Sequence, residues 1–282
     1  MTSMPEIEVA GIQVRAISVA GMQTCIQIPS WKLAFDIGRC PPGAASVPRV
    51  FFTHGHVDHM GGVVHHVATR ALVGMSPPEY FVPREYFDGF QRLLDVWRDL
   101  DGSDLPCTVR AVAPGDRIEL GKGRHVDVFR SVHRAPTVGY ALHRAVRRLR
   151  PDWSGLSSEE IARRARSGER PHVQEYRPEV VFCGDTTIDV VERVAVVREA
   201  KLLILEATFL DDRVSPERAR ETGHVHLDDL VARADLFENE GILLTHFSAR
   251  YSPRQVQNIL ASKLPESLRE RTFALPSAEQ VR

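Results

Sequence analysis

The sequence predicts an α/β fold with two sets of β-strands and helices between them. Residues 7–37 alternate apolar and polar side chains, which is typical of strands, and residues 107–143 return to that pattern. Residues 62–72 and 83–100 are predicted to be helices, so the strands fall into two sets around residue 100. A chain of 282 residues is long for one domain, but a fold with two sheets would accommodate it, and we expect one domain over residues 1–282.

Three strands are expected at the start of the chain, with the sequences EIEVAGIQVRAISVA, TCIQIP and KLAFDIG. The second helix is expected to begin at Pro83, because proline is favoured in a first helical turn, and to end at Asp101 and Gly102. Its apolar side chains are expected to lie in the core or on a dimer face. They are Phe87, Phe90, Leu93, Leu94 and Trp97.

The most informative stretch is VFFTHGHVDHMGG, residues 50–62. An apolar strand is followed by four side chains that can bind metal, and they are His54, His56, Asp58 and His59. In an extended loop His54 and His56 point to the same side, whereas the next two follow where the chain must turn. The group can therefore face two neighbouring points, which favours two metal ions over one. Imidazole and carboxylate ligands without thiolates suit zinc, with manganese or iron as alternatives.

Further candidates follow other predicted strands. His133, in SVHRAPTVGYAL, arrives where a strand should end, and a two-metal site needs ligands beyond the first motif. Asp185 follows an apolar strand in VVFCGDTT, where a carboxylate can bridge two ions about 3.5–4 Å apart, the arrangement used for displacement at phosphorus. His246 follows the apolar strand in GILLTHFSARY.

Residues 144–177 differ from the rest of the chain in charge. They contain nine arginines, no lysine and five acidic residues, in a protein whose formal net charge is −1. A short capped helix is predicted from Ser157 or Ser158 onward. The insertion is either a solvated surface segment or an arm that contacts phosphate, and the forked shape of arginine slightly favours the arm. The arginines expected to contact RNA are Arg147, Arg148, Arg163 and Arg164.

The overall composition restricts the partner and the compartment. A pI of about 6.9 argues against a surface that is basic all over, so an anionic partner needs a local patch. The four cysteines are widely spaced and form no C-x-x-C pair, which argues against a disulfide framework or a zinc knuckle. No signal peptide or membrane span is recognisable, so the cytoplasm is the expected compartment.

The first motif resembles the HxHxDH signature of the metallo-β-lactamase superfamily, and the match is complete. The resemblance implies a four-layer αβ/βα sandwich of two mixed β-sheets flanked by helices, with the metals at its edge. Asp36 ends a predicted strand, and it is either a turn carboxylate or, as the resemblance implies, a support for the metal-binding loop. The order of HRAPTVGY, CGDTT, EATF, GH and LTHFSARY resembles the ribonuclease Z family of tRNA 3′-processing endonucleases across most of residues 30–255.

This second resemblance implies a site for two zinc ions. The residues implied to bind one ion are His54, His56 and His133. Those implied to bind the other are Asp58, His59 and His246. Asp185 would bridge the two ions. Glu206 and His224 match the family's acidic–histidine pair beside the leaving group, and with Asp58 they are the predicted catalytic residues.

The expected chemistry is hydrolysis of a phosphodiester. Two zinc ions would lower the pKa of a bound water towards 7 and neutralise the charge of the phosphodiester. His224, polarised by Glu206, is expected to give a proton to the departing alkoxide. Ser248, Arg250 and Tyr251 follow the last expected ligand, and they either hold phosphate oxygens or a terminal nucleotide, or they cap and pack the end of a strand.

The favoured interpretation is a zinc-dependent phosphodiesterase, an endoribonuclease that cleaves tRNA 3′ trailers. The alternative is a small-molecule metallo-hydrolase of the same fold, acting on a cyclic nucleotide, another phosphodiester or a lactone. A non-catalytic RNA-binding protein or scaffold is disfavoured, because all seven implied ligand positions are intact. The resemblance also implies a homodimer in which the arm of one subunit holds RNA for the site of the other.

Overall fold

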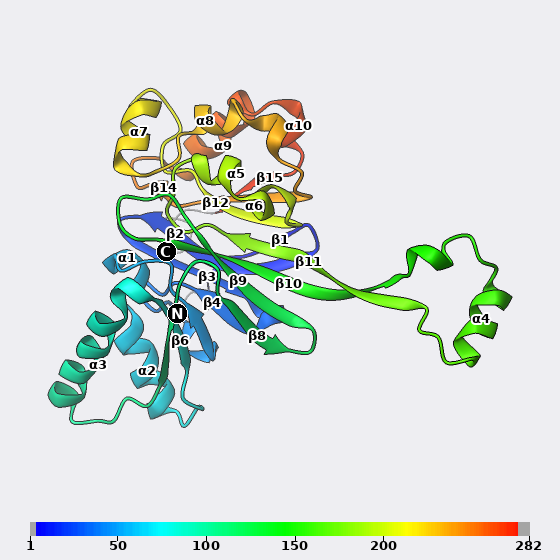
Figure 1. The fold of residues 1–282 in the computed structure, drawn as a ribbon. Helices are drawn as coiled ribbons and strands as arrows, with labels where there is room; N and C mark the ends of the chain where they lie inside the picture. Colours follow the sequence, from blue (N-terminus) through cyan, green and yellow to red (C-terminus); the bar gives the residue numbers. More distant parts are fainter. Residues whose placement is uncertain (1–3, 276–282) are drawn as a thin grey trace.

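The computed structural model describes residues 4–275, which form two β-sheets packed face to face with helices on their outer faces (Figure 1). The first sheet holds strands β1 to β7 in sequence order, and β14 joins it beside β2. The second sheet has the order β15-β13-β12-β11-β10-β9-β8. Both sheets contain parallel and antiparallel pairs. The expected four-layer αβ/βα sandwich is therefore confirmed.

The first sheet begins with a hairpin where the sequence predicted one strand. Ala10 and Gly11 take φ angles of 50° and 70° and turn the chain back on itself, so that β1 pairs antiparallel with β2. Both central residues of such a tight turn need positive φ, which glycine adopts without strain. The strands of this sheet are β1 (Glu6–Val9), β2 (Ile12–Ala20), β3 (Gln23–Ile28), β4 (Leu33–Phe35), β5 (Arg49–Phe51), β6 (Glu79–Pro83) and β7 (Thr108–Val112). Since β7 belongs here, the division between the two sets of strands lies after Val112 and not around residue 100.

Three helices accompany the first sheet, namely α1 (Val57–Met60), α2 (Val63–Leu72) and α3 (Phe87–Asp101). α2 confirms the helix predicted over residues 62–72. The predicted helix start at Pro83 was wrong, because Pro83 ends β6 and a 3₁₀ turn, η3 (Arg84–Tyr86), precedes α3. β6 is short and ends in proline, so too few of its residues alternate to show the two-residue period of a strand. Along α3, Phe90 and Leu94 are buried, whereas Trp97 is exposed.

The second sheet carries three parallel neighbours, β11, β12 and β13, whose carboxyl ends meet at one edge. Its strands are β8 (Arg117–Gly121), β9 (Arg124–Arg130), β10 (Val138–Leu149), β11 (His172–Phe182), β12 (Leu202–Glu206), β13 (Gly241–Thr245) and β15 (Thr272–Ala274). β14 (Phe247–Ser248) leaves this sheet and pairs with β2 of the first sheet. The chain after β13 therefore ties the two sheets together at the edge where β11 to β13 end.

Short helices accompany the second sheet. They are α5 (Asp189–Arg193), α6 (Ala195–Glu199), α7 (Pro216–Thr222), α8 (Leu227–Val231), α9 (Pro253–Lys263) and α10 (Glu266–Arg269). The remaining 3₁₀ turns outside the arm are η1 (Pro29–Trp31), η2 (Ala44–Ser46) and η5 (Ala234–Leu236). Among residues 4–275, no helix combines the length and the apolar character that crossing a lipid bilayer requires.

The two sheets are joined by an apolar core that contains a group of aromatic rings. Phe35 of the first sheet stacks on Phe182 of the second with ring centroids 5.1 Å apart, and its ring centroid lies 5.8 Å from that of Tyr140. Aromatic pairs of this kind add about 0.5–1.5 kcal/mol beyond the area that they bury. The hydroxyl of Tyr140 donates a hydrogen bond to the carbonyl of Phe52, so a buried polar bond also joins the sheets just before the first metal-binding motif.

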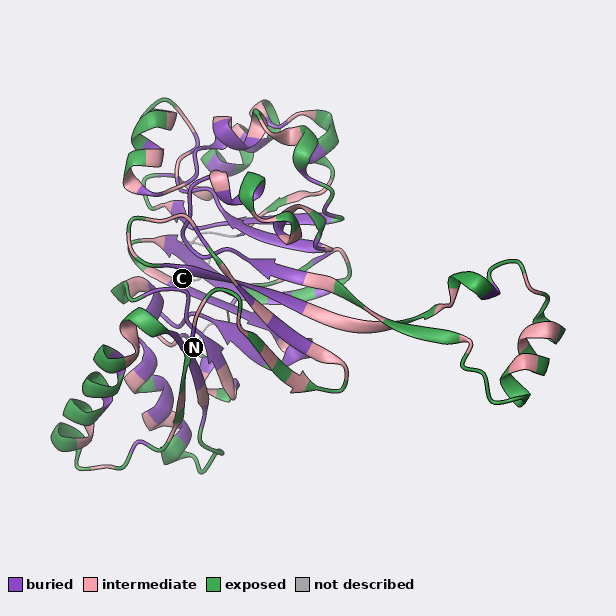
Figure 2. Cartoon of the chain, viewed as in Figure 1, coloured by how far each residue is buried: buried purple, intermediate pink, exposed green. Residues whose placement is uncertain are grey.

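The arginine-rich insertion forms an arm that projects from the second sheet (Figure 1). β10 pairs with β9 only as far as Arg144, but with β11 as far as Leu149, so the two strands continue alone as a hairpin. The tip holds η4 (Pro151–Trp153) and the predicted helix, α4 (Ser158–Arg166), whose capping box at Ser157 is present. Figure 2 shows that burial falls from the base of the hairpin to its tip, although Trp153 is fully buried within the tip.

Candidate metal centre

The residues expected to bind metal follow the carboxyl ends of strands from both sheets. The loop after β5 carries His54 and His56, and α1 carries Asp58 and His59. In the second sheet, the remaining candidates lie after β9, β11 and β13, and β12 ends in Glu206. They are His133, Asp185 and His246. Because β11 to β13 are parallel neighbours, the side chains after them meet at one edge, opposite the loop of the first sheet.

The structure brings all seven expected ligands together, in two groups whose ligand atoms lie within 4.8 Å of one another. One group is His54, His56, His133 and Asp185. The other is Asp58, His59 and His246. These are the two sets that the resemblance implied, and each combines residues from both sheets. Neither set can therefore form unless the two sheets are packed.

Asp185 lies between the two groups and faces each with a different oxygen. Its Oδ2 is 3.8 Å from Nε2 of His54. Its Oδ1 is 3.3 Å from Nε2 of His59 and 3.4 Å from Nε2 of His246. Burial raises the pKa of this carboxyl, but the facing histidines His246 and His59 outweigh burial and hold the pKa well below its usual range. The carboxylate is thus charged, and it is placed where a bridging ligand would be.

In three of the expected ligands, His59, His133 and His246, the other ring nitrogen is fixed by the protein. Nδ1 of His59 hydrogen-bonds with Asp36 at 2.8 Å, and Nδ1 of His133 with the carbonyl of Gly223 at 2.8 Å. Nδ1 of His246 lies 2.9 Å from the hydroxyl of Thr208. Such bonds orient a metal-binding imidazole and select the nitrogen that faces the metal.

A buried imidazole nitrogen without a partner is the clearest sign that these residues fit a metal. Nε2 of His59, His133 and His246 is buried and makes no hydrogen bond within the part of the chain that the structure describes. An unsatisfied buried polar atom of this kind costs about 1–3 kcal/mol. His133 belongs to one ligand group and His59 and His246 to the other, so a cation in each group would satisfy these atoms. Imidazole and carboxylate donors without thiolates are typical of catalytic zinc sites.

Asp36 supports the metal-binding loop, which decides between its two predicted roles. The carboxylate is fully buried and accepts hydrogen bonds from the backbone N–H and the hydroxyl of Thr53, both at 2.8 Å. Its Oδ2 also bonds with His59. The hydroxyl of Thr53 in turn lies 3.0 Å from Nδ1 of His54. Asp36 therefore positions the loop and one imidazole at once.

Thr53 and Thr208 were not predicted from the sequence as site residues. Each stands directly beside a motif, Thr53 before HxHxDH and Thr208 within EATF, so their position next to the ligands was the available signal. Threonine is common after a strand, however, and only the fold shows that these hydroxyls meet the ring nitrogens of His54 and His246.

The two ligand loops touch at Gly184, the residue before Asp185. Gly184 has a φ of 63°, and a Cβ atom there would lie 2.8 Å from Cβ of Thr53. Glycine satisfies both demands, since it tolerates positive φ and has no side chain to clash. The strand end that carries Asp185 can therefore lie directly against the strand end that carries His54.

Glu206 and His224 form a pair beside the two groups. Nδ1 of His224 lies 2.8 Å from Oε1 of Glu206, which is almost fully buried and also accepts hydrogen bonds from the N–H of Thr186 and the hydroxyl of Thr208. Burial works to lower the pKa of His224, but the charge of Glu206 and the hydrogen bond to it raise that pKa to about 9. The imidazole is therefore protonated near neutral pH and can donate a proton.

The three predicted substrate contacts after His246 differ in their surroundings. Tyr251 is buried, and its hydroxyl accepts a bond from the N–H of Leu210 and donates one to Asp211, which is the packing role. Arg250 is exposed and donates a hydrogen bond to the hydroxyl of Ser248. The side chains of Ser248 and Arg250 are at least partly exposed and can contact a substrate. The hydroxyl of Tyr251 already makes two hydrogen bonds within the protein.

The four arm arginines lie on the projecting hairpin and its tip and are mostly solvent-exposed (Figure 1). Arg147 and Arg163 are exposed, and Arg148 makes an exposed pair with Glu175 at 3.3 Å. Arg164 stacks over the ring of Trp153 at 5.8 Å. Exposed ion pairs of this kind contribute less than about 1 kcal/mol, so the guanidinium groups can exchange an internal partner for a phosphate.

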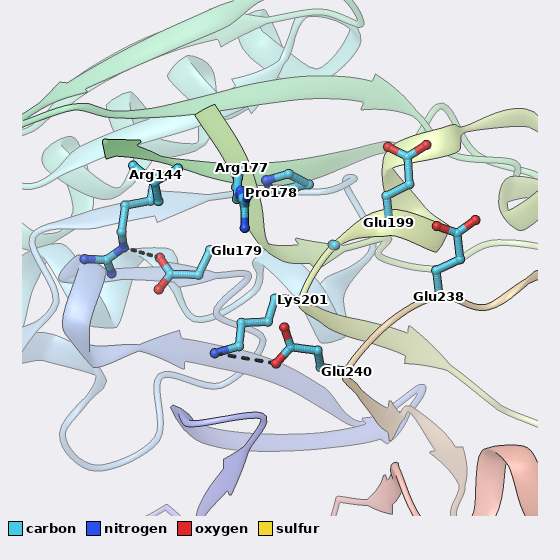
Figure 3. A pocket seen from close by; sticks show the side chains of 10 residues that line it. Arg144, Arg177, Pro178, Glu179, Glu199, Lys201, Glu238 and Glu240 are labelled. Atoms are coloured by element: carbon cyan, nitrogen blue, oxygen red, sulfur yellow. Dashed lines mark hydrogen bonds and ion pairs between the residues drawn. The ribbon is translucent and has the colours of Figure 1, made fainter. Parts of the chain in front are cut away.

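A pocket of about 400 Å³ lies at the base of the arm, away from the ligands (Figure 3). Lys201 and Glu240, which line it, precede β12 and β13, whereas Glu206 and His246 lie at the opposite ends of these strands. Its lining holds three basic and four acidic side chains, two of each in ion pairs with one another. Arg144 contacts Glu179 at 2.7 Å, and Lys201 lies 3.7 Å from Glu240. The pocket therefore has no excess of positive charge to hold an anion.

Comparison with known proteins bears on the fold and the family. Residues 38–247 match the family model described as "Beta-lactamase superfamily domain". The protein named tRNase Z TRZ1, from Arabidopsis thaliana, is 39% identical over 277 residues, which cover 98% of this chain and 99% of the relative.

Two crystal structures share the fold over nearly the whole chain. The metallo-β-lactamase fold protein YhfI from Bacillus subtilis has a TM-score of 0.64 at 14% identity, covering 95% of this chain and 97% of the other. The short form of human tRNase Z has a TM-score of 0.55 at 18% identity, covering 98% and 94%. At these identities the similarity concerns the fold alone.

Proposed function

The chain belongs to the metallo-β-lactamase superfamily and, within it, to the ribonuclease Z family, and we propose that it is a metal-dependent endoribonuclease that removes 3′ trailers from tRNA precursors. The observation that carries this proposal is the arrangement of two ligand groups around Asp185, with the Glu206–His224 pair beside them. This arrangement supplies both of the things that hydrolysis of a phosphodiester needs, a place for hydroxide and a proton donor. The named tRNase Z relative supports precursor tRNA as the substrate.

Two zinc ions per chain are the proposed cofactor. His54, His56 and His133 would hold one, and the other would be held by Asp58, His59 and His246, with Asp185 between them. When bound, the ions would lower the pKa of water towards 7 and neutralise phosphodiester charge. The set of donors contains no thiolate, which suits zinc and does not exclude manganese or iron.

The protein's own groups then determine the orientation of the substrate and the movement of the proton. Oδ2 of Asp58 accepts a hydrogen bond of 2.9 Å from the N–H of Gly21, which fixes this carboxylate beside His59 and His246. His224, held by Glu206, would donate a proton to the alkoxide that leaves. Ser248 is the last residue of β14, and Arg250 follows it two residues later. Both side chains would contact phosphate oxygens.

The arm is proposed to hold the RNA backbone. Arginines concentrate in residues 144–177, whereas the protein as a whole carries a formal net charge of −1. The hairpin that carries these arginines projects away from the sandwich (Figure 1), which suits a substrate much longer than the scissile bond. The family resemblance leads us to propose a homodimer in which the arm of one subunit serves the site of the other. The four free thiols agree with a reducing compartment, and we propose the cytoplasm.

The proposed function is tested by incubating the zinc-loaded protein with a tRNA precursor that bears a 3′ trailer, beside a chromogenic phosphodiester and a lactone. We expect cleavage at the trailer junction, seen on a denaturing gel, and removal of activity by a chelator. Cleavage of the small diester or the lactone with no cleavage of the precursor would instead indicate a small-molecule hydrolase. Light scattering at several concentrations would test the homodimer separately.

A further inference from the structure

A second group of possible metal ligands lies outside the candidate metal centre, where the arm leaves the sheet. It consists of His125 and Asp127 on β9 and His143 on β10. His143 is directly opposite His125 in the register of the two strands. One residue later, at Arg144, the pairing of β10 with β9 ends and the free hairpin begins. The group therefore occupies the root of the arm.

Each of the three side chains offers one ligand atom, and these atoms lie within 4.8 Å of one another. The two imidazole rings are stacked, with centroids 4.7 Å apart and planes 10° apart. Oδ2 of Asp127 is 3.6 Å from Nε2 of His125 and 3.5 Å from Nε2 of His143. These separations are too long for hydrogen bonds. They are close to the roughly 3.3 Å that separates two ligand atoms on one tetrahedral zinc with bonds of about 2.0–2.1 Å.

His125 has buried ring nitrogens without a hydrogen-bond partner, as three histidines of the candidate metal centre do. Its side chain is only 1% exposed, and neither of its ring nitrogens has a hydrogen-bond partner among residues 4–275. Within this described part of the chain, the other buried imidazole nitrogens without a partner belong to His59, His133 and His246. A neutral imidazole usually donates one hydrogen bond and accepts another, so two empty nitrogens in a buried ring require an explanation.

The protonation states of the three side chains leave lone pairs for a cation, while Arg117 already balances the charge of Asp127. Burial lowers the pKa of both His125 and His143, so each imidazole is neutral and offers a lone pair at neutral pH. Asp127 is charged: burial raises its pKa, but hydrogen bonds from Arg117 outweigh that effect and lower it. Arg117 is exposed and donates to Oδ1 at 2.7 Å and to Oδ2 at 2.9 Å, and each carboxylate oxygen keeps a second lone pair for a metal.

We propose that His125, Asp127 and His143 bind a divalent transition metal of the zinc class, with one nitrogen from each imidazole and Oδ2 of the carboxylate. Imidazole with carboxylate is a donor set that zinc accepts, and water would complete the coordination. Glu119 faces His125 across the β8–β9 ladder and is near enough in register to give a further oxygen. A metal here would fasten β10 to β9 and restrict twisting of the arm at its root.

The first test counts metal in the full-length protein after equilibrium dialysis against zinc. We expect the unmodified chain to hold one zinc ion more than the double variant His125→Gln/His143→Gln. A matched control, His65→Gln/His172→Gln, replaces two exposed histidines and should keep the full number. The difference of one ion does not depend on how many ions the catalytic centre holds, so failure of the proposed function would leave this readout intact.

The second test measures cleavage by trypsin at Arg144, a partly buried residue where the pairing of β10 with β9 ends. Such cleavage requires the root of the arm to open, so its rate should fall as the zinc concentration rises. At a zinc concentration 100 times the dissociation constant of this site, the rate should be lower by up to about 100-fold. The double variant should show no such protection by zinc. If that variant does not fold, as judged by circular dichroism, Asp127→Asn retains both imidazoles and should also lose the ion. Equal zinc content and equal protection in the unmodified and variant proteins would overturn the proposal.

Discussion

Nδ1 of His224 lies 2.8 Å from Oε1 of Glu206, and this bond fixes the ring between those of His133 and His246, at centroid distances of 5.1 Å and 5.5 Å. The nitrogen that is not bonded to Glu206, Nε2, is left to meet a substrate. His224 therefore stands beside the ligands with its own anchor, and this makes its role separable from theirs.

His224→Ala is expected to leave the zinc content near two ions per chain and to slow cleavage of RNA. A general acid typically contributes about 10²–10⁴ in rate, and RNA has a poor leaving group that needs a proton. Nitrophenolate leaves without one, so hydrolysis of a nitrophenyl diester should fall much less. The measurement compares turnover of both substrates with metal content. Equal losses on the two substrates would contradict the acid role, and loss of zinc would make His224 a ligand.

Asp185→Ala is expected to abolish hydrolysis of every substrate. Its two oxygens face different groups, so its removal separates the ions and takes away the charge that both share. Elemental analysis after dialysis should show fewer than two ions per chain, and turnover should fall to background. Asp212→Ala, at an exposed aspartate, is the matched control and should behave as the unmodified protein does. Two ions with normal turnover in Asp185→Ala would show that the bridge lies elsewhere.

Asp36→Asn tests the support beneath the metal-binding loop. The substitution keeps the size of the side chain but removes the charge that faces His59. Partners of this kind typically change metal affinity by about 10–100-fold, so competition with a chelator should show zinc affinity lowered by that factor. The fold should persist, because the amide oxygen can still accept the hydrogen bond from the N–H of Thr53, and the amide N–H that replaces Oδ2 can donate to the hydroxyl of Thr53. Unchanged affinity would reduce Asp36 to an ordinary turn carboxylate.

Replacement of four arm arginines tests the RNA-binding arm. The substitutions to alanine are at Arg147, Arg148, Arg163 and Arg164. RNA binding should weaken, and each lost phosphate contact should flatten the log–log salt dependence of affinity by about 0.7–0.9. Hydrolysis of a small diester should stay within a few-fold, because the ligands are untouched.

The matched control for the arm replaces exposed arginines of the sandwich. They are Arg92, Arg110, Arg193 and Arg254. This variant removes the same charge and should change the salt slope much less. If both variants bind RNA with the salt slope of the unmodified protein, the insertion is a solvated surface segment.

His66 predicts an acid-sensitive step in stability. Burial, helped by the charge of Arg70, lowers the pKa of His66 to about 4, from the usual 6.5 that applies in the unfolded chain. Between these values the unfolded chain binds a proton that the folded chain does not. The free energy of unfolding should therefore be fully maintained above pH 6.5 and should fall by about 1 kcal/mol per pH unit as pH drops towards 4.

His66→Gln should flatten this pH dependence, as followed by urea unfolding at several pH values. It should also be less stable at pH 7.5, because Nδ1 of His66 bonds with the hydroxyl of Tyr80 at 2.7 Å. His172→Gln, at an exposed histidine of the arm, should keep the slope of the unmodified protein. The same slope in both variants would assign the acid sensitivity to other groups.

The parts of the fold that could be predicted are those whose signal is local in sequence. Alternation of apolar residues located most strands, and HxHxDH placed four ligands within a single loop. The hairpin at Ala10 was missed because alanine at positive φ leaves no mark in the sequence. The sheet to which β7 belongs depends on its pairing with β6 rather than on its own residues.

The site was predictable to the same extent. Ligands could be identified where a histidine or an aspartate directly follows an apolar strand, because both parts of that pattern are local in sequence. Their anchors could not, because the carbonyl that holds His133 belongs to Gly223, 90 residues away. The group at the root of the arm was missed for a similar reason, since His125 and His143 meet only through the β9–β10 register.

The contact between Gly184 and Thr53 has a consequence for the speed of metal capture. The backbone of Gly184 packs against the side chain of Thr53, a contact that includes no ligand atom, and a Cβ atom at Gly184 would force the two apart. Ordering of the two ligand loops therefore takes place when the sheets pack, during folding. An arriving ion meets ligands that lose little conformational freedom, so uptake should be limited by diffusion and dehydration of the ion rather than by a rearrangement of the chain.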